Sequence, residues 1–521
     1  MKRFSIFNHV LGPVMRGPSS SHTAGAYHLG CMVRSLAGGS ISRAAVTFDP
    51  NGSYARTYAQ QGADRAFAMG FMGKPLTDES FFTALEDAPR AGLRLLFQIR
   101  PLEHPDHPNA MMIDVRDAAG EIFSVEARSI GGGDVEIISL DGIEIAFNGS
   151  AFELFIEAAH SQQAFLAAAL AGDGALMSGP NPIALGGRQA FVARRSKALS
   201  GFIRSSVEEL VPGAIIRESA PVYLVQIAEP LFFDAEALVR LCEKRGWSLG
   251  RAGLEYETRI LGLRPEEVIA EMLRRYDIMA AAAARGLDPA FSGMQLLAAS
   301  AGSVFRAEAE GRLALGGPSA RAAARALAVM HVNSAMGVVC AAPTGGSAGT
   351  IPGTILTLAE ERHLSRDEIA LSLLAAGVIG VITAQRATFA AEVAGCQVEI
   401  GAAGAMAAAA VVDACGGSAR QACDAAAIAY QNTMGSVCDL VQGLVEIPCH
   451  TRNAVAAASA FVCADLVLGG YANPIPLDET IDAVYSVGRL LPAELRCTAR
   501  GGLALTHSAL AMKSRLGGDK P

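Results

Sequence analysis

The chain has 521 residues, more than one hydrophobic core usually holds, so we expect a multidomain protein. Its formal net charge of -8 excludes an extensive basic surface, and we therefore expect neither a nucleic-acid partner nor binding to an anionic membrane. Ten cysteines follow an N-terminus that does not resemble a signal peptide, which favours a cytoplasmic protein with reduced thiols.

Two β-containing domains are predicted in the first part of the chain. Residues 1–148 combine short β-patterned runs with helical stretches and glycine loops, which predicts an α+β domain. Residues 152–228 follow the order strand, helix, strand, strand, helix, strand, with the closing strand expected at residues 221–227. That βαββαβ order is typical of ferredoxin-like domains.

The remaining residues, 229–521, are helical in pattern almost throughout, which predicts a single all-α domain. Asp234 and Ser365 stand where helix N-caps are expected. The longest apolar run, residues 369–384, is shorter than the roughly 20 residues that span a membrane. We therefore interpret it, like the run at residues 400–412, as a buried bundle helix.

Three cysteines in the helical region stand near glycine or proline: Cys396 in AGCQVEIG, Cys438 in MGSVCDLVQG and Cys449 in VEIPCHTRN. Such positions favour helix ends or short loops, from which thiolates can reach a common point. Cys438 and Cys449 are too far apart for a CxxC loop, so spacing alone leaves metal binding and core packing both open. Five other cysteines are predicted to be ordinary core residues: Cys31, Cys242, Cys415, Cys423 and Cys463.

Longer segments around these three cysteines resemble the catalytic subunit of the bacterial iron–sulfur-dependent L-serine dehydratases. The matching segments are residues 332–354, 395–417, 438–454 and 495–504. The resemblance implies that Cys396, Cys438 and Cys449 hold a [4Fe–4S] cluster.

The N-terminal region resembles the smaller subunit of the same family, through GPVMRGPSSSHTAGA at residues 12–26 and HPN at 107–109. Residues 152–228 resemble the ACT domain that some members carry. The chain therefore resembles a fusion of a small subunit, an ACT-like domain and an all-α catalytic domain. For the ACT-like domain we expect a structural role, and for the whole protein the resemblance implies a homodimer.

The resemblance implies a dehydratase (ammonia-lyase) that converts the hydroxy amino acid L-serine into pyruvate and ammonia. Three cysteine ligands leave one iron of the cluster open, and the substrate hydroxyl is expected to leave at that iron. Among the motif residues, Ser19, Ser20, Ser21, Thr23 and Asn109 are the candidates for substrate binding, and His22 is the candidate for proton transfer. Without the resemblance, SSSHT fits a helix cap equally well.

Several positions depart from the family pattern. Gln61 replaces a histidine, and Cys497 replaces a glutamate. The run at residues 385–392 introduces Arg386, a candidate for binding the second carboxylate of a diacid substrate. A salt bridge, for example with Glu392, is the other interpretation of this arginine. L-serine is the leading substrate, and another β-hydroxy amino acid or a diacid is the alternative.

Two other classes of protein are alternatives to this enzyme. A pyridoxal-phosphate dehydratase needs a lysine, and no lysine occurs between Lys244 and Lys513, which excludes this class for the helical region. A non-catalytic iron–sulfur and ACT sensor stays open because of the changes at Gln61 and Cys497.

The loop at residues 343–349 lacks the Lys-Ser/Thr ending of a phosphate loop, so we predict a packed helix junction near the substrate.

Overall fold

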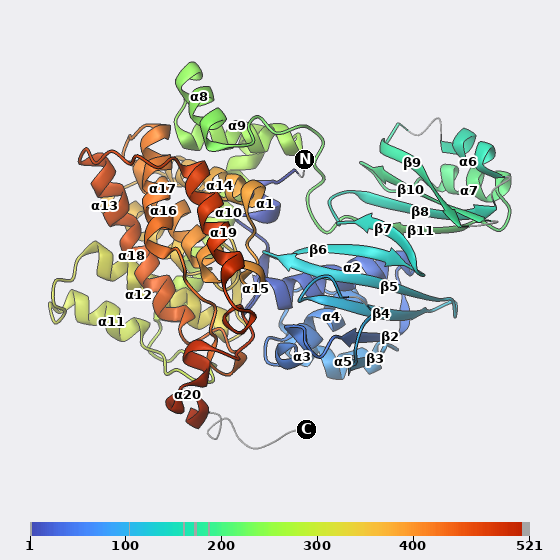
Figure 1. Ribbon diagram of the computed structural model, residues 1–521, viewed down its shortest axis with the longest axis horizontal. Helices are drawn as coiled ribbons and strands as arrows, with labels where there is room; N and C mark the ends of the chain where they lie inside the picture. The colour runs from blue at the N-terminus through green and yellow to red at the C-terminus, as the bar shows by residue number, and fades with distance from the viewer. Residues whose placement is uncertain (1–2, 104, 160–161, 171–173, 186–187, 513–521) are drawn as a thin grey trace.

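The computed structural model describes residues 3–103, 105–159, 162–170, 174–185 and 188–512. The molecule combines N-terminal β-sheets and their helices with a largely helical C-terminal region. Figure 1 shows the C-terminal helices on one side and the sheets on the other.

The N-terminal region is built on a six-stranded sheet that carries helices on one face. Its elements are β2 (Ile41–Phe48), α3 (Tyr54–Thr57), α4 (Ala63–Met72), η2 (Glu79–Thr83), α5 (Ala84–Arg90), β3 (Arg94–Ile99), β4 (Ala110–Asp117), β5 (Ile122–Gly131), β6 (Asp134–Leu140) and β7 (Ile143–Phe147), preceded by η1 (Ser20–Ala24) and α2 (Gly25–Leu36). The strand order is β3-β2-β4-β5-β6-β7, in which only β2 and β3 are parallel. Buried residues alternate along β4 and β5, and this face packs with α2 and α4 in one hydrophobic core.

A four-stranded sheet follows, and Figure 1 shows it farthest from the C-terminal helices. Its elements are β8 (Phe152–Ala159), α6 (Gln163–Leu170), β9 (Leu176–Leu185), β10 (Arg188–Arg195), α7 (Gly201–Leu210) and β11 (Ile215–Ser219). The sheet order is β11-β8-β10-β9 with antiparallel neighbours, so the βαββαβ order of elements is the predicted one.

The predicted position of the closing strand was wrong. The strand is β11, whereas residues 221–227 form no strand. The backbone N–H groups of Val222 and Tyr223 donate to the carbonyl of Gly149, and that of Leu224 donates to Oδ1 of Asn8. These tertiary hydrogen bonds use the backbone N–H groups that a strand would need for pairing. The segment is therefore a loop, although its apolar and β-branched residues favour a strand.

The N-terminal segment packs into the helical region. Helix α1 (Ile6–His9) lies in the helical core, and the carboxylate of buried Glu257 accepts hydrogen bonds from the backbone of Ile6 and Phe7. Strand β1 (Val14–Arg16) pairs with β12 (Val338–Cys340). β12 corrects the expectation that everything after residue 229 is helical. This pairing brings the residues after β1 against the helical region.

The C-terminal region is a bundle whose core is rich in alanine. Its helices are α8 (Ala235–Arg245), α9 (Leu249–Leu261), α10 (Pro265–Leu287), α11 (Ala301–Ala309), α12 (Pro318–Ser334), α13 (Thr350–Arg362), α14 (Arg366–Arg386), α15 (Ala391–Ala394), η4 (Cys396–Val398), α16 (Ile400–Ala414), α17 (Ala419–Thr433), η5 (Val441–Gly443), α18 (Cys449–Leu468), α19 (Leu477–Leu490), η6 (Ala493–Leu495), η7 (Gly502–Leu505) and α20 (His507–Met512). Both predicted caps are confirmed: Asp234 accepts from the N–H of Ala237, and Ser365 forms a capping box with Glu368.

Three stretches are long and apolar enough to cross a membrane by length and composition: α14, residues 396–414 and α18. In the first two, 78% and 89% of the most apolar window is buried inside the protein. Close packing explains the small residues of α14, because a Cβ at Gly380 would lie 2.1 Å from a methyl carbon of Val10 in the N-terminal segment.

Candidate active site

The three predicted cysteine ligands come together in one buried cluster. Cys396 begins η4, Cys438 lies in the loop before η5, and Cys449 is the first residue of α18. Their exposed fractions are 1%, 2% and 3%, and all three are free thiols. Three segments of the helical region therefore bring their sulfur atoms into one buried cluster.

The thiol of Cys438 is central to this group, because hydrogen bonds link it to the thiols of Cys396 and Cys497. The ligand atoms of Cys396, Cys438 and Glu399 all lie within 4.8 Å of one another. The hydrogen bond with Cys438 and burial raise the pKa of Cys396, and burial raises that of Cys449. Such thiols release their protons when a cation lies between them, so this donor set fits an iron–sulfur cluster.

One cation already lies beside the sulfur atoms. Nη1 of Arg452 is 3.6 Å from Sγ of Cys396 and donates to the carbonyl of Val437 at 2.7 Å. Nη2 of the same guanidinium donates to Asp439 at 3.0 Å, which fixes its orientation. The positive charge favours the thiolate form of the neighbouring cysteines.

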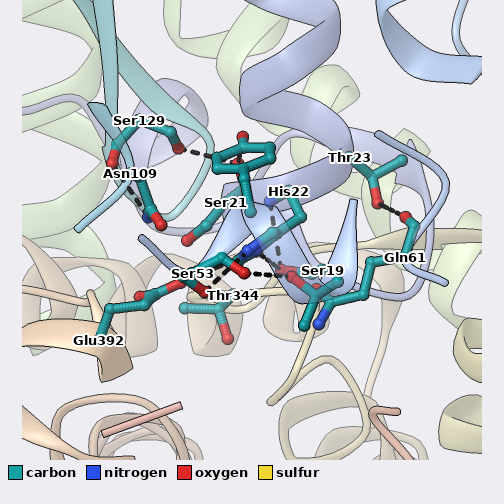
Figure 2. Close-up of polar contacts among 12 residues, drawn as sticks. Ser19, Ser21, His22, Thr23, Ser53, Gln61, Asn109, Ser129, Thr344 and Glu392 are labelled. Carbon is teal, nitrogen blue, oxygen red and sulfur yellow. Dashed lines mark hydrogen bonds and ion pairs between the residues drawn. The ribbon is translucent and has the colours of Figure 1, made fainter. Parts of the chain in front are cut away.

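The serine-rich motif forms the opposite wall of the site, in the five-residue turn η1 and the start of α2. Figure 2 shows its contacts. The hydroxyl of Ser19 accepts from the backbone N–H of His22 at 3.2 Å, so the predicted cap interaction is present. The hydroxyls of Tyr54 and Ser129 both donate to the carbonyl of Ser21, at 2.6 and 2.9 Å. These bonds fix the backbone of the turn, while the side chain of Ser21 hydrogen-bonds to Glu392.

This turn approaches the helical region through the glycine loop at residues 343–349. A Cβ at Gly345 would lie 2.9 Å from both the carbonyl oxygen of Pro18 and the backbone nitrogen of Ser20. Only glycine permits this contact between the two regions. The residue before Gly345 reaches Glu399, whose carboxylate accepts from the hydroxyl of Thr344. The loop is therefore a packed junction, in agreement with the prediction.

His22 is completely buried and takes part in a chain of polar contacts. Its Nε2 lies 3.0 Å from the hydroxyl of Ser53, and its Nδ1 lies 3.3 Å from that of Ser19 (Figure 2). Nδ1 also lies 3.8 Å from Oε1 of Glu392. Burial lowers the pKa of His22 to about 3, so the ring is neutral at neutral pH and a weaker base than the sequence-based proposal assumed.

Glu392 is the functional candidate that the sequence analysis treated only as a possible partner of Arg386. Its side chain is 4% exposed and accepts hydrogen bonds from Asn109 and Ser21. Burial raises the pKa of this carboxyl group. The residue lies four positions before Cys396, so the helical region supplies an acid–base group directly beside its sulfur ligands. Nothing local in the sequence distinguishes it from a surface glutamate.

A second carboxylate, that of the partly buried Glu399, lies within 4.8 Å of the sulfur atoms of Cys396 and Cys438. Burial raises its pKa to about 7. Two side-chain oxygens near the serine turn, Oε1 of Gln61 and Oδ1 of Asn109, are buried and have no hydrogen-bond partner among the described residues. Gln61, which replaces a family histidine, is held by a bond from Nε2 to the carbonyl of Gly443. The site thus offers unused acceptors that suit a positively charged ammonium group.

The structure does not bring Arg386 to this group. Its guanidinium pairs with Asp482, and not with Glu392. It also lies 3.8 Å from Asp478, which like Asp482 belongs to α19. It lines a cavity of about 780 Å³ between the N-terminal sheet and the helical region, together with Arg128 and Phe389. The salt-bridge interpretation of Arg386 is therefore the one that these contacts favour.

We expect Arg386→Ala to change the KM for L-serine by less than about threefold, because a partly exposed ion pair contributes little and the arginine is already neutralised. Steady-state kinetics with L-serine and with β-hydroxy diacids would measure this effect. Asp482→Asn is the matched control. A tenfold rise in KM for a diacid in R386A alone would show instead that Arg386 binds a second carboxylate.

Comparison with known proteins gives a consistent picture. The profile of the serine dehydratase alpha chain family matches residues 157–504. A probable L-serine dehydratase alpha chain of Bacillus subtilis (strain 168) is 35% identical over 288 residues, which cover 55% of this chain and 96% of that protein. A probable L-serine dehydratase alpha chain of Latilactobacillus sakei is 44% identical over 194 residues, 37% of this chain and 93% of that protein. The L-serine dehydratase alpha chain of Peptoniphilus asaccharolyticus is 35% identical over 271 residues, 52% and 93% of the two chains.

Proposed function

Because this chain belongs to the serine dehydratase alpha chain family, a family of lyases, we propose that it is a [4Fe–4S]-dependent L-serine ammonia-lyase that forms pyruvate and ammonia. The observation that carries the proposal is the juxtaposition of the buried cysteine group with the pair His22 and Glu392, of which the first comes from the N-terminal region and the second from the helical region. Sulfur ligands and acid–base groups in one enclosed site are what a cluster-dependent elimination requires.

The residues that would hold the cluster are Cys396, Cys438 and Cys449. A cluster with one iron free of protein sulfur supplies a Lewis acid that makes a hydroxyl a better leaving group. Arg452 would hold the adjacent thiolates by its charge, and Asp439 would orient Arg452. The three thiols already lie in one buried cluster.

Proton removal from the α-carbon is assigned here to Glu392. Burial raises the pKa of its carboxyl group, which makes its carboxylate a stronger base than an exposed one. Neutral His22, 3.8 Å away, would donate a hydrogen bond to the ionised carboxylate and hold it in position. In this proposal Glu392 is the base and His22 positions it, whereas the sequence analysis proposed His22 for proton transfer.

The serine turn and its surroundings suit the two charged groups of an amino acid. The hydroxyls of Ser19, Ser20, Ser21 and Thr23 are the proposed partners of the substrate carboxylate, although Thr23 also donates to the carbonyl of Gln61 at 2.9 Å. Asn109 and Gln61 present unpaired carbonyl oxygens to the ammonium group. Exclusion of water from this buried region would strengthen each of these contacts.

The remaining assignments complete the proposal. We take residues 1–148 as a small-subunit-like domain, 152–228 as an ACT-like, ferredoxin-like domain with a structural role, and 229–521 as the catalytic domain of a cytoplasmic homodimer. The sheet order β11-β8-β10-β9 supports the ferredoxin-like assignment. L-serine is the proposed substrate, and another β-hydroxy amino acid is the alternative.

Anaerobic purification of the full chain, followed by iron and sulfide analysis and a keto-acid assay, tests this function. We expect a brown protein that produces pyruvate from L-serine and much less keto acid from larger hydroxy amino acids or diacids. A brown protein inert toward all of these substrates would favour the non-catalytic sensor. Turnover without iron would overturn the cluster-dependent mechanism.

A further inference from the structure

Cys497 is a fourth cysteine in the buried group, and the backbone holds it there. Its N–H donates to the carbonyl of Cys438 at 2.9 Å, while the N–H of Cys438 donates to the carbonyl of Leu495 at 2.8 Å. The segment before η7 therefore runs beside the Cys438 loop like a short strand. Cys497 is 9% exposed, and its thiol hydrogen-bonds to that of Cys438.

The same segment is fixed from its other side by Asp439, the residue that follows Cys438. One carboxylate oxygen accepts from the backbone N–H of Leu503 at 2.9 Å. The other accepts from Arg452, whose guanidinium touches Cys396. Asp439 thus links the Cys497 segment to Arg452, the cation beside Cys396. Hydrogen bonds therefore set the position of the Cys497 segment relative to Arg452.

Cys497 faces the acid–base side of the site. Its thiol lies within electrostatic range of the carboxylates of Glu392 and Glu399. It also borders a small cavity lined by Ser53, the residue that contacts Nε2 of His22. A sulfur atom at this place lies between the cysteine group and the proposed substrate groups.

We propose that the thiolate of Cys497 is the fourth sulfur ligand of the iron–sulfur cluster held by Cys396, Cys438 and Cys449. This inference rests on the proposed function, since it concerns the same cofactor. Cys497 would occupy the iron position that three cysteines leave open, and a substrate hydroxyl would have to displace it from that iron. Cys497 would then protect the cluster from iron loss and control when a hydroxyl group reaches it.

Oxidation of the reconstituted full chain tests this ligand without relying on activity. An iron that has no cysteine ligand is the first to be lost, and its loss gives a [3Fe–4S] cluster that is visible by electron paramagnetic resonance. With mild ferricyanide, we expect the wild type to remain [4Fe–4S] and Cys497→Ala to give about five times more [3Fe–4S] signal, reversed by ferrous iron. Cys463→Ala, a buried cysteine about 21 Å along α18 from Cys449, should behave like the wild type.

Cys497→Ser keeps the size of the side chain and serves if C497A does not fold, as judged by circular dichroism. It should give an intermediate signal, because a hydroxyl is a poorer ligand for iron than a thiolate. Equal conversion in the wild type, C497A and C497S would overturn the role of Cys497 while leaving pyruvate formation, and so the proposed function, intact. A wild type that takes up no iron and sulfide would overturn both.

Discussion

Cys396→Ala is expected to remove the iron–sulfur chromophore and to lower pyruvate formation from L-serine by roughly 10³-fold or more. Cys396 has three contacts in the donor set: it hydrogen-bonds to Cys438, its sulfur lies within 4.8 Å of a carboxylate oxygen of Glu399, and Arg452 lies beside it. Alanine removes a sulfur ligand and leaves a small buried space. The other thiols, whose pKa values burial keeps high, then lack enough binding energy to hold the cluster.

Iron and sulfide per chain, the visible absorbance and the keto-acid rate measure this effect. Cys463→Ala is the matched control, because it also deletes a buried thiol from the helical region but lies in a different hydrophobic cluster. The control should keep its cluster and at least half of its activity. A C396A protein that retains full iron and sulfide would remove Cys396 from the ligand set.

The elements that depend on local sequence were predictable. Asp234 and Ser365 begin helices because a side-chain oxygen can bond an N–H three residues later, which is a local relation. The βαββαβ order follows from periodicity in the same way. The cysteine ligands were predictable only through the resemblance of long motifs, since their spacing matches no single loop.

What the sequence could not predict depends on contacts between distant segments. Residues 221–227 have the composition of a strand, but Gly149 and Asn8 take their backbone donors. β12 exists because β1 returns to pair with it. The contact of His22 with Glu392 and that of Cys438 with Cys497 are likewise products of tertiary packing. Such contacts decide the chemistry of this site, and no local pattern encodes them.

Glu392→Gln is expected to lower kcat for L-serine by about 10²- to 10⁴-fold while the iron and sulfide content stays at the wild-type level. Glutamine keeps the size of the side chain and can still accept hydrogen bonds from Asn109 and Ser21, so the turn should remain in place. It cannot accept the α-proton. If Glu392 is the base, wild-type kcat should rise with pH as its carboxyl group ionises, because burial raises that pKa above the ordinary value. The variant should lose this dependence.

The kinetic isotope effect with α-deuterated L-serine separates this role from a structural one. It should increase in E392Q, since proton removal then limits the rate, whereas a displaced substrate would mainly raise KM. Glu257→Gln is the control: Glu257 is equally buried but binds the backbone of α1, away from the site. We expect Glu257→Gln to lower Tm and to leave kcat unchanged. If E392Q keeps the wild-type kcat and His22→Ala abolishes turnover, the base is His22 and not Glu392. Substrate binding would then have to raise the pKa of His22, which burial lowers in the free protein.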